Sequence, residues 1–372
     1  MKVLITGANG FVGKNLVAHL SERKDIEVVP FTRENTLAQL PSMVADTDFV
    51  FHLAGVNRPQ SQDEFKVGNT DLTSALCDAI KASGKPIPVL YTSSIQAERD
   101  NPYGVSKRAA EQLLEDLHFS HGSTVHVLRL PNVFGKWARP DYNSAVATFC
   151  HNITRGLPIQ INDRQAEVSL VYIDDVIDSF IVAMDAGASI DAVNEVSPVY
   201  RVTVGELADQ LHAFHESRAT LISEPVGAGL VRALYSTYVS YLPVEQFTYE
   251  VPKYGDPRGV FVEMLKTKDS GQFSYFTAHP GITRGGHYHH SKTEKFLVIK
   301  GNACFRFRHI VSGEFYELFT QGEQPRIVET VPGWTHDITN VGDDEMIVML
   351  WANEIFDRER PDTCALPVGT HA

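Results

Sequence analysis

The sequence predicts a doubly wound parallel α/β domain followed by an all-β jelly-roll domain. The apolar run KVLIT at residues 2–6 ends in the glycine-rich turn GANGFVG, and strand and helix patterns then alternate along the chain. After LPVEQFTYEVPKYGDPRG the helical periodicity stops, and short alternating strands with glycine-rich turns follow. We therefore expect one domain at 1–245 and a second at 246–372, which is long enough for a double-sheet jelly roll.

The composition is that of a soluble globular protein. Hydrophobic residues make up 43% and charged residues 21% of the 372 residues, which is enough for two cores. The formal net charge of -13 is spread along the chain without a basic block, so we expect neither nucleic acid nor a membrane as a partner. The chain has no run of about 18 apolar residues, and its cysteines are widely spaced. We expect a cytoplasmic protein.

The glycine-rich turn predicts a dinucleotide site. Gly7, Gly10 and Gly13 stand between a strand and a helix, where glycine permits a tight turn, a close approach to pyrophosphate and close helix packing. The alternative is an ordinary loop. We expect five further residues to contact the cofactor. Asn9, Phe11 and Val12 belong to this turn, and Leu53 and Ala54 belong to the turn that ends the strand DFVFHLAG.

The residues after the second strand, IEVVPF, bear on the choice of cofactor. NAD-binding units usually carry a carboxylate there that accepts hydrogen bonds from the ribose hydroxyls. Here the strand ends in Phe31, and Thr32 and Arg33 follow. The Arg33 guanidinium suits a 2′-phosphate, so we expect NADPH. The alternative is that Arg33 is a solvated loop residue.

A catalytic group is predicted at the end of the strand PVLYTSS. Ser94 closes this strand, and Tyr103 and Lys107 follow in YGVSK, one helical turn apart on one face. A phenol with a pKa near ~10 needs a nearby cation to act as an acid or base at neutral pH, and Lys107 supplies it. We expect Ser94 to hold the substrate oxygen and Tyr103 to protonate it while a nicotinamide delivers hydride.

Over roughly residues 1–245 the chain resembles the extended short-chain dehydrogenase/reductase family. The motifs GANGFVG, YTSS, YGVSK, RLPNVFG and VYIDDV occur in the order of that family. The resemblance implies a nucleotide-sugar substrate, which Asn132 of RLPNVFG would contact. The arginine that the family often places before VYIDDV is Val168 here, so Arg164 becomes the candidate for the substrate phosphates.

The spacing of the catalytic group departs from the pattern of this family. The gap between Ser94 and Tyr103 is short, so either Ser93 or Ser94 can be the catalytic hydroxyl.

The stretch GITRGGHYHHSKTEKFLVIKG, residues 281–301, predicts a metal site. His287, His289 and Glu294 take alternating or nearly alternating positions on two expected strands joined by a turn. His290 adjoins His289, and strand register decides which of the two faces inward. The alternative is a polar cluster held by hydrogen bonds alone.

The same stretch resembles the first cupin motif, from Gly281 to Gly301. The second cupin motif is matched by PGWTHDITN, in which His336 completes the ligand set. The resemblance implies a divalent transition metal. Three imidazoles and a carboxylate suit zinc, iron, manganese or nickel, and we expect zinc.

Two further stretches, PKYGDPRGVFVE and TRGGHYHH, look like the dTDP-sugar 3,5-epimerase branch of the cupin fold. This resemblance implies that Arg258 and Glu263 contact a nucleotide sugar and that His287 is the base that removes a proton. The cupin motif makes His287 a metal ligand instead. The two roles compete for one side chain.

As a whole the chain is similar to the bifunctional capsular-polysaccharide enzymes of the UDP-N-acetyl-L-fucosamine pathway. The resemblance implies a UDP-4-keto-6-deoxy amino sugar as substrate, namely UDP-2-acetamido-2,6-dideoxy-hexos-4-ulose. The cupin would epimerise its C3 and the reductase would reduce its C4 ketone with NADPH, giving UDP-2-acetamido-2,6-dideoxy-L-talose for capsule or O-antigen synthesis.

Two alternatives to this function stay open. One is a 4-keto-sugar reductase whose cupin is a non-catalytic, metal-stabilised dimerisation or binding module. The other is a redox-sensing protein that binds NADPH without turnover. Because both folds commonly form dimers, we expect a homodimer.

Overall fold

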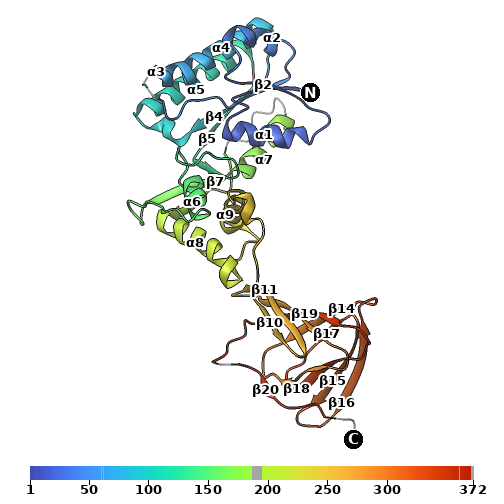
Figure 1. The fold of residues 1–372 in the computed structure, drawn as a ribbon. Helices are drawn as coiled ribbons and strands as arrows, with labels where there is room; N and C mark the ends of the chain where they lie inside the picture. The colour runs from blue at the N-terminus through green and yellow to red at the C-terminus, as the bar shows by residue number, and fades with distance from the viewer. Residues whose placement is uncertain (60, 62, 187–194, 360, 370–372) are drawn as a thin grey trace. The chain divides into compact units, whose positions relative to one another are not determined.

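The computed structural model describes residues 1–59, 61, 63–186, 195–359 and 361–369. The chain divides into two compact units (Figure 1). The first comprises Met1–Leu211 and Arg232–Pro243, and the second comprises His212–Val231 and Val244–Ala372. No helix in the described part of the chain combines the length and the apolar character that a membrane crossing requires.

The elements up to Ser240 are a succession of strands and helices. In chain order they are β1 (Lys2–Thr6), α1 (Phe11–Ser21), β2 (Glu27–Phe31), η1 (Leu37–Gln39), α2 (Leu40–Val44), β3 (Phe49–His52), α3 (Asp63–Phe65), η2 (Lys66–Asp71), α4 (Leu72–Ser83), β4 (Val89–Ser94), η3 (Ile95–Glu98), α5 (Pro102–His121), β5 (Val125–Leu130), β6 (Asn132–Phe134), α6 (Ala145–Ile153), β7 (Glu167–Tyr172), α7 (Ile173–Ala186), β8 (Tyr200–Thr203), α8 (Val204–Thr220), β9 (Ile222–Ser223) and α9 (Gly229–Ser240).

From Val244 onward the described elements are a short helix and strands. They are η4 (Val244–Gln246), β10 (Lys253–Asp256), β11 (Gly259–Thr267), β12 (Gly271–Ala278), β13 (Thr283–Tyr288), β14 (Glu294–Lys300), β15 (Asn302–His309), β16 (Phe315–Gln321), β17 (Ile327–Glu329), β18 (Trp334–Asn340), β19 (Met346–Ala352) and β20 (Cys364–Ala365).

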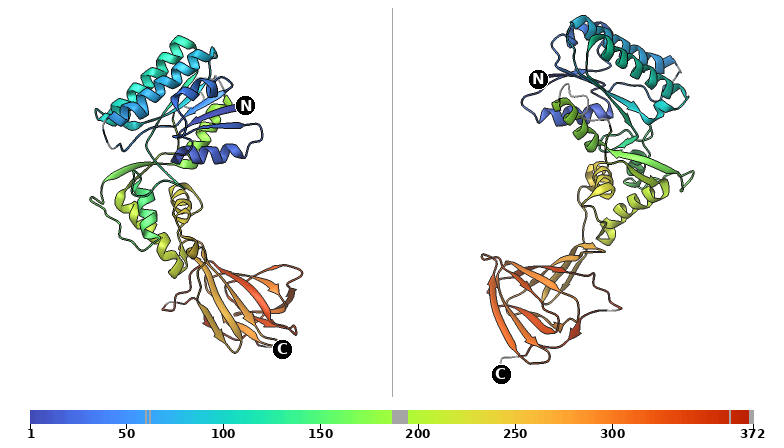
Figure 2. Two further views of the ribbon diagram at one scale, coloured as in Figure 1. Left: turned by 45° about the horizontal axis from the view of Figure 1, so that its top comes forward. Right: turned by 180° about the vertical axis from the view of Figure 1, so that it is seen from behind.

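The first unit is built on a parallel sheet of five strands in the order β2-β1-β3-β4-β5. Helices α4 and α5 cover one face and α1 and α7 the other (Figures 1 and 2). Apolar strand residues such as Leu4, Val50 and Tyr91 pack with Ile80 of α4 and Leu114 of α5. This sheet confirms the predicted doubly wound fold, and its strands end together at one edge.

A smaller sheet, β6-β7-β8, follows the parallel sheet within the first unit. Strand β6 runs parallel to β7, and β8 runs antiparallel to it. This sheet lies in the region of the chain that carries RLPNVFG and VYIDDV.

The second unit contains two packed sheets. One has the order β10-β11-β12-β19-β14-β17, with β9 beside β11, and the other has the order β16-β15-β18-β13-β20. A shared core joins Phe276 and Phe296 of the first sheet to Phe305 and Ile338 of the second. The prediction of an all-β second domain is thereby confirmed. Strand β9 pairs with β11, and the segment His212–Val231 belongs to this compact unit although it precedes residue 245. The predicted domain boundary after residue 245 stays a prediction.

Candidate functional site

The glycine-rich turn after β1 requires glycine for steric reasons. Gly7 has a φ of +72°, and a Cβ added there would lie 2.8 Å from the Cα of Ala54. A Cβ on Gly13 would lie 2.3 Å from the carbonyl oxygen of Gly7. Any side chain at either position would displace backbone. Glycine at both positions therefore allows this tight turn immediately before the N-terminus of α1, which favours anions.

A cavity of about 540 Å³ opens beside this turn. The predicted cofactor residues that line it are Gly7, Asn9, Gly10, Arg33, Leu53 and Ala54. Phe11, Val12 and Gly13 lie in the first turn of α1. Glu34 lines the cavity as well, so an acidic and a basic side chain adjoin at its rim. The cavity and the crowded glycines fit a dinucleotide.

The structure brings Ser94, Tyr103 and Lys107 together at the end of β4. The side chain of Ser94 lies close enough to Tyr103 to lower the pKa of its phenol. Helix α5 begins at Pro102, and Asn101 caps it by accepting a hydrogen bond from the amide of Gly104 at 2.8 Å. This start of the helix places Tyr103 beside the strand end.

The ammonium group of Lys107 is buried in the same place. The side chain is 5% exposed, and its Nζ donates to the carbonyl oxygen of Thr92 at 2.9 Å. Burial lowers the pKa of Lys107 to about 8, and the charge of Glu111 opposes this shift. Burial raises the pKa of Tyr103, while the nearby Ser94 hydroxyl partly offsets the effect. At neutral pH the phenol is protonated and the lysine is largely cationic.

The two serines of β4 have different partners. Ser93 donates its hydroxyl to Glu111 of α5, which also pairs with the guanidinium of Arg129 at 2.6 Å. Ser94 is the serine whose side chain lies beside Tyr103 and lowers its pKa. The geometry therefore favours Ser94 over Ser93 as the hydroxyl that faces a substrate.

An aromatic and arginine group beside Tyr103 was missed in the sequence. Besides burial, which is the main cause, the nearby Tyr142 also raises the pKa of Tyr103. The guanidinium carbons of Arg58 and Arg139 lie 5.9 Å and 5.5 Å from the centroid of the Tyr142 ring. Among the described residues, neither arginine pairs with a carboxylate. Arg58 lies in the loop after β3, and Arg139 lies in the loop after β6. Because ligands bind at the carboxyl ends of strands in such sheets, this position was the signal in the sequence that could have found them.

The two substrate residues predicted in the first unit have partners of their own. Asn132, at the start of β6, donates to the carbonyl oxygen of Ser169 at 3.1 Å. Arg164 pairs with Asp209 of α8, with 2.6 Å between Nη2 and Oδ2. Their assignment to the substrate stays a prediction.

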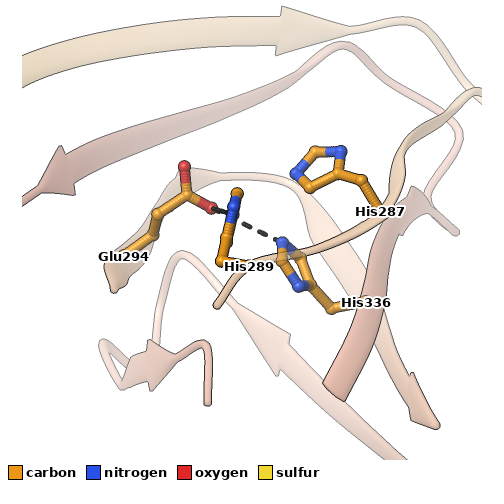
Figure 3. Close-up of side chains that lie close together, drawn as sticks. All are labelled: His287, His289, Glu294 and His336. Carbon is orange, nitrogen blue, oxygen red and sulfur yellow. Dashed lines mark hydrogen bonds and ion pairs between the residues drawn. The ribbon is translucent and has the colours of Figure 1, made fainter. Parts of the chain in front are cut away.

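A second site lies in the β-rich unit, where His287, His289, Glu294 and His336 converge (Figure 3). One ligand atom from each residue lies within 4.8 Å of those of the others. His289, Glu294 and His336 are 2%, 5% and 5% exposed, whereas His287 is only partly buried. The neighbouring His290 is exposed, so His289 is the histidine that faces the cluster.

A bulge in β13 helps to form the cluster. The pairing of β13 with β18 shifts register between Gly285 and His287, so that His287 stands opposite His336. Gly285 has a φ of +97°, and a Cβ there would lie 2.9 Å from the carbonyl oxygen of His336. Glycine at this position therefore allows two histidines on adjacent strands to meet.

The hydrogen-bonding pattern of the cluster fits a cation. His289 has an acceptor at each ring nitrogen: the carbonyl oxygen of Asp362 at Nδ1, and Oε2 of Glu294 at 3.2 Å from Nε2. His336 Nε2 lies 3.4 Å from the same oxygen. A neutral imidazole has one N–H, and in His289 this N–H is used at Nδ1. Nε2 then carries a lone pair that faces the lone pairs of Oε2, and a metal ion bound to both atoms would satisfy them. Ligands about 2.1 Å from a tetrahedral ion lie about 3.4 Å apart.

The charges in the cluster are set by burial and by neighbours. Burial alone would raise the pKa of Glu294, but the nearby imidazoles of His289 and His336 and the charge of Lys292 lower it well below the usual range. Lys292 Nζ lies 3.0 Å from the second carboxylate oxygen, Oε1. Burial, with the charge of His336, lowers the pKa of His287 to about 4. At neutral pH the cluster offers a carboxylate and a neutral His287.

The remaining predicted residues, Arg258 and Glu263, have ionic partners outside the cluster. Arg258 pairs with Asp256 in the turn between β10 and β11, at 2.5 Å. Glu263 pairs with Lys266 on β11, at 3.3 Å. The structure brings the four cluster residues together, but it leaves these two with neighbours on their own hairpin and strand.

Comparison with known proteins assigns both parts of the chain. Residues 3–196 match the NAD dependent epimerase/dehydratase family, and residues 254–364 match the polysaccharide biosynthesis C-terminal domain. The chain is 65% identical over 372 residues to the UDP-2-acetamido-2,6-beta-L-arabino-hexul-4-ose reductase of Pseudomonas aeruginosa, covering 100% of both chains.

Solved structures agree with this assignment. The capsular polysaccharide assembling protein CapF from Staphylococcus aureus superimposes with a TM-score of 0.92 and 43% identity, over 99% of this chain and 100% of that chain. UDP-glucuronic acid 4-epimerase from Bacillus cereus, solved with NAD, gives a TM-score of 0.56 and 19% identity over 65% of this chain and 98% of that chain, which shows the fold alone. The chain therefore belongs to the NAD dependent epimerase/dehydratase family and, within it, to the CapF-like capsular polysaccharide proteins that carry a polysaccharide biosynthesis C-terminal domain.

Proposed function

We propose that this protein is a nucleotide-sugar 4-ketoreductase that also epimerises its substrate. The substrate is a UDP-2-acetamido-2,6-dideoxy-hexos-4-ulose, the reductant is NADPH and the product is UDP-2-acetamido-2,6-dideoxy-L-talose, for capsule or O-antigen synthesis. The observation that carries the proposal is the grouping of Ser94, Tyr103 and the buried Lys107 at the end of β4, in a chain 65% identical to a reductase of such a sugar. Homodimeric assembly and a cytoplasmic location stay predictions.

In the reduction, Ser94 holds the ketone oxygen by a hydrogen bond and Tyr103 gives it a proton. Tyr103 starts in the required protonated state because burial raises its pKa. Lys107 stabilises the phenolate that is left, since its pKa of about 8 keeps it largely cationic at neutral pH. Bound NADPH supplies the hydride.

The arginines of the first unit divide between the two ligands. Arg33, at the rim of the cavity, pairs with the 2′-phosphate of NADPH. Arg58 and Arg139 bind the diphosphate of the sugar nucleotide, because both guanidinium groups are without carboxylate partners in the described chain and lie beside Tyr142. Arg164 is less suited, since Asp209 already neutralises it.

In the epimerisation, His287 removes the C3 proton, which the adjacent C4 ketone makes acidic, and water supplies a proton to the opposite face of the enolate. The pKa of about 4 leaves His287 neutral at neutral pH, so one ring nitrogen carries a lone pair. His289, Glu294 and His336 would hold a divalent ion, with zinc expected. The bound ion supplies Lewis-acid stabilisation of negative charge at the ketone oxygen.

The main experiment follows the full-length protein with the UDP-4-keto sugar in deuterated water, with and without NADPH. We expect deuterium at C3 without NADPH, and a reduced sugar with it, by NMR. The Tyr103→Phe variant is expected to keep the exchange and lose the reduction. Continued hydride transfer in that variant would rule out the proposed reductase mechanism.

The second candidate function, a non-catalytic metal-stabilised module, predicts reduction without deuterium at C3. The His287→Asn variant separates the two roles of this residue. Retained zinc with lost exchange supports a base. Lost zinc would make His287 a fourth ligand.

A further inference from the structure

The C-terminal segment Asp362–Val368 runs along the strand that carries the first cluster histidine. Strand β20 pairs with β13, with Ala365 opposite His287. The amide of Leu366 donates to the carbonyl oxygen of Gly286 at 2.9 Å. This segment is distant in sequence from the cluster and yet forms one of its walls. Asp362 lies at its start.

The carboxylate of Asp362 binds the loop that follows β13. Its Oδ1 accepts from the amide of His290 at 2.8 Å. Its Oδ2 accepts from the amides of Ser291 at 2.7 Å and Lys292 at 2.8 Å, and from the hydroxyl of Ser291 at 2.9 Å. Three successive backbone amides thus converge on one side chain, which determines the path of the loop between His289 and Glu294.

The backbone of Asp362 contacts a cluster residue directly. Its carbonyl oxygen accepts a hydrogen bond from Nδ1 of His289. A proton held at Nδ1 leaves the lone pair at Nε2, the atom that lies 3.2 Å from Oε2 of Glu294. The contact therefore sets the tautomer and the ring orientation that a metal ligand needs.

The same residue acts on Glu294 through Lys292. Asp362 holds the amide of Lys292, and Nζ of this lysine lies 3.0 Å from Oε1 of Glu294. Lys292 is 7% exposed, so the position of its side chain depends on the loop. With Oε1 paired to Lys292, Oε2 is left to face His289 and His336.

We propose that Asp362 is a positioning residue of the metal centre, which orients His289 by its carbonyl and Glu294 by its hold on the Lys292 loop. This inference rests on the proposed metal site. It assigns a function to the C-terminal segment, because the Asp362 carboxylate anchors both the loop that carries Lys292 and the backbone whose carbonyl holds His289.

The test measures zinc affinity of the full-length protein by competition with a chromophoric chelator. Asp362→Asn keeps the backbone carbonyl and the volume of the side chain, but its amide group would face donors. We expect about ten- to hundredfold weaker zinc binding. Ser291→Ala removes one of the four hydrogen bonds to the carboxylate and should have a smaller effect in the same direction.

Asp269→Asn, at an exposed aspartate in the turn after β11, is the matched control and should bind zinc as the unaltered protein does. Reductase activity of the Asp362→Asn variant, measured by NADPH oxidation, shows that the chain is folded. Zinc affinity of this variant within twofold of the unaltered protein would overturn the positioning role alone. Failure of the unaltered protein to bind zinc would instead overturn the proposed metal site.

Discussion

The side chain of Ser94 lies beside the phenol of Tyr103 and lowers its pKa, while the adjacent Ser93 donates its hydroxyl to Glu111. Only one of the two serines can therefore reach a ketone that Tyr103 protonates. The relationship places the proton donor and the oxygen-binding hydroxyl side by side before any substrate arrives.

Replacement of the two serines should have unequal effects. Ser94→Ala should lower kcat by about a hundredfold, because both the substrate oxygen and Tyr103 lose a partner. Ser93→Ala should keep most of the activity and lower the free energy of unfolding by about 1 to 2 kcal/mol, since its contact with Glu111 is structural. Steady-state kinetics and urea unfolding check both. A larger loss of kcat in Ser93→Ala would reverse the assignment.

The pH dependence of reduction should reflect Lys107. Burial lowers its pKa to about 8, so the ammonium loses its proton as the pH rises through this value. We expect kcat/KM to fall on the alkaline side of about 8, because the phenolate of Tyr103 then lacks its cation. In Lys107→Arg the guanidinium does not titrate, so this fall should vanish even if the activity is lower. A fall that persists in this variant would point to another group.

Cofactor preference should depend on Arg33, which lines the cavity beside the glycine turn. Arg33→Ala should lower kcat/KM for NADPH about tenfold or more and leave that for NADH nearly unchanged, because only NADPH carries the 2′-phosphate. Glu34→Gln, at the adjoining position, should instead improve NADPH by removing a negative charge. If Arg33→Ala left kcat/KM for NADPH unchanged, this role would be contradicted.

Substrate affinity should depend on Arg58 and Arg139, which lie 5.9 Å and 5.5 Å from the Tyr142 ring. Each substitution by alanine should raise KM for the UDP-sugar about tenfold, since a charged hydrogen bond to phosphate contributes about 1.5 to 3 kcal/mol. Arg201→Ala, at an exposed arginine of β8, is the control and should change KM little. Unchanged inhibition by UDP in both variants would exclude them from the diphosphate site.

Metal binding should depend on Glu294, whose Oε2 faces both His289 and His336. Glu294→Ala should abolish bound zinc in elemental analysis. The unaltered protein should gain about 2.7 kcal/mol of stability at a hundredfold excess of zinc over Kd, and the variant should gain nothing. Glu323→Ala, at an exposed position, is the control. Undiminished zinc content in Glu294→Ala would show that the cluster is not the metal site.

Much of both sites could be predicted because the chemistry lies in short stretches. The turn GANGFVG, the spacing of Tyr103 and Lys107 on α5, and the alternation of His287 and His289 near Glu294 follow from local strand and helix periods. These periods determine which residues share a face without any distant contact. The parallel and antiparallel sheets follow from the same patterns.

The sequence by itself determined the two fold classes and the main site residues, since these depend on local periodicity. Only the tertiary structure decided which of two adjacent candidates faces a site: Ser94 rather than Ser93, and His289 rather than His290. It also joined Asp362 to His289, residues far apart in the chain. The physical reason is that side-chain direction depends on strand register and bulges, and that loop contacts form between segments that only folding brings together.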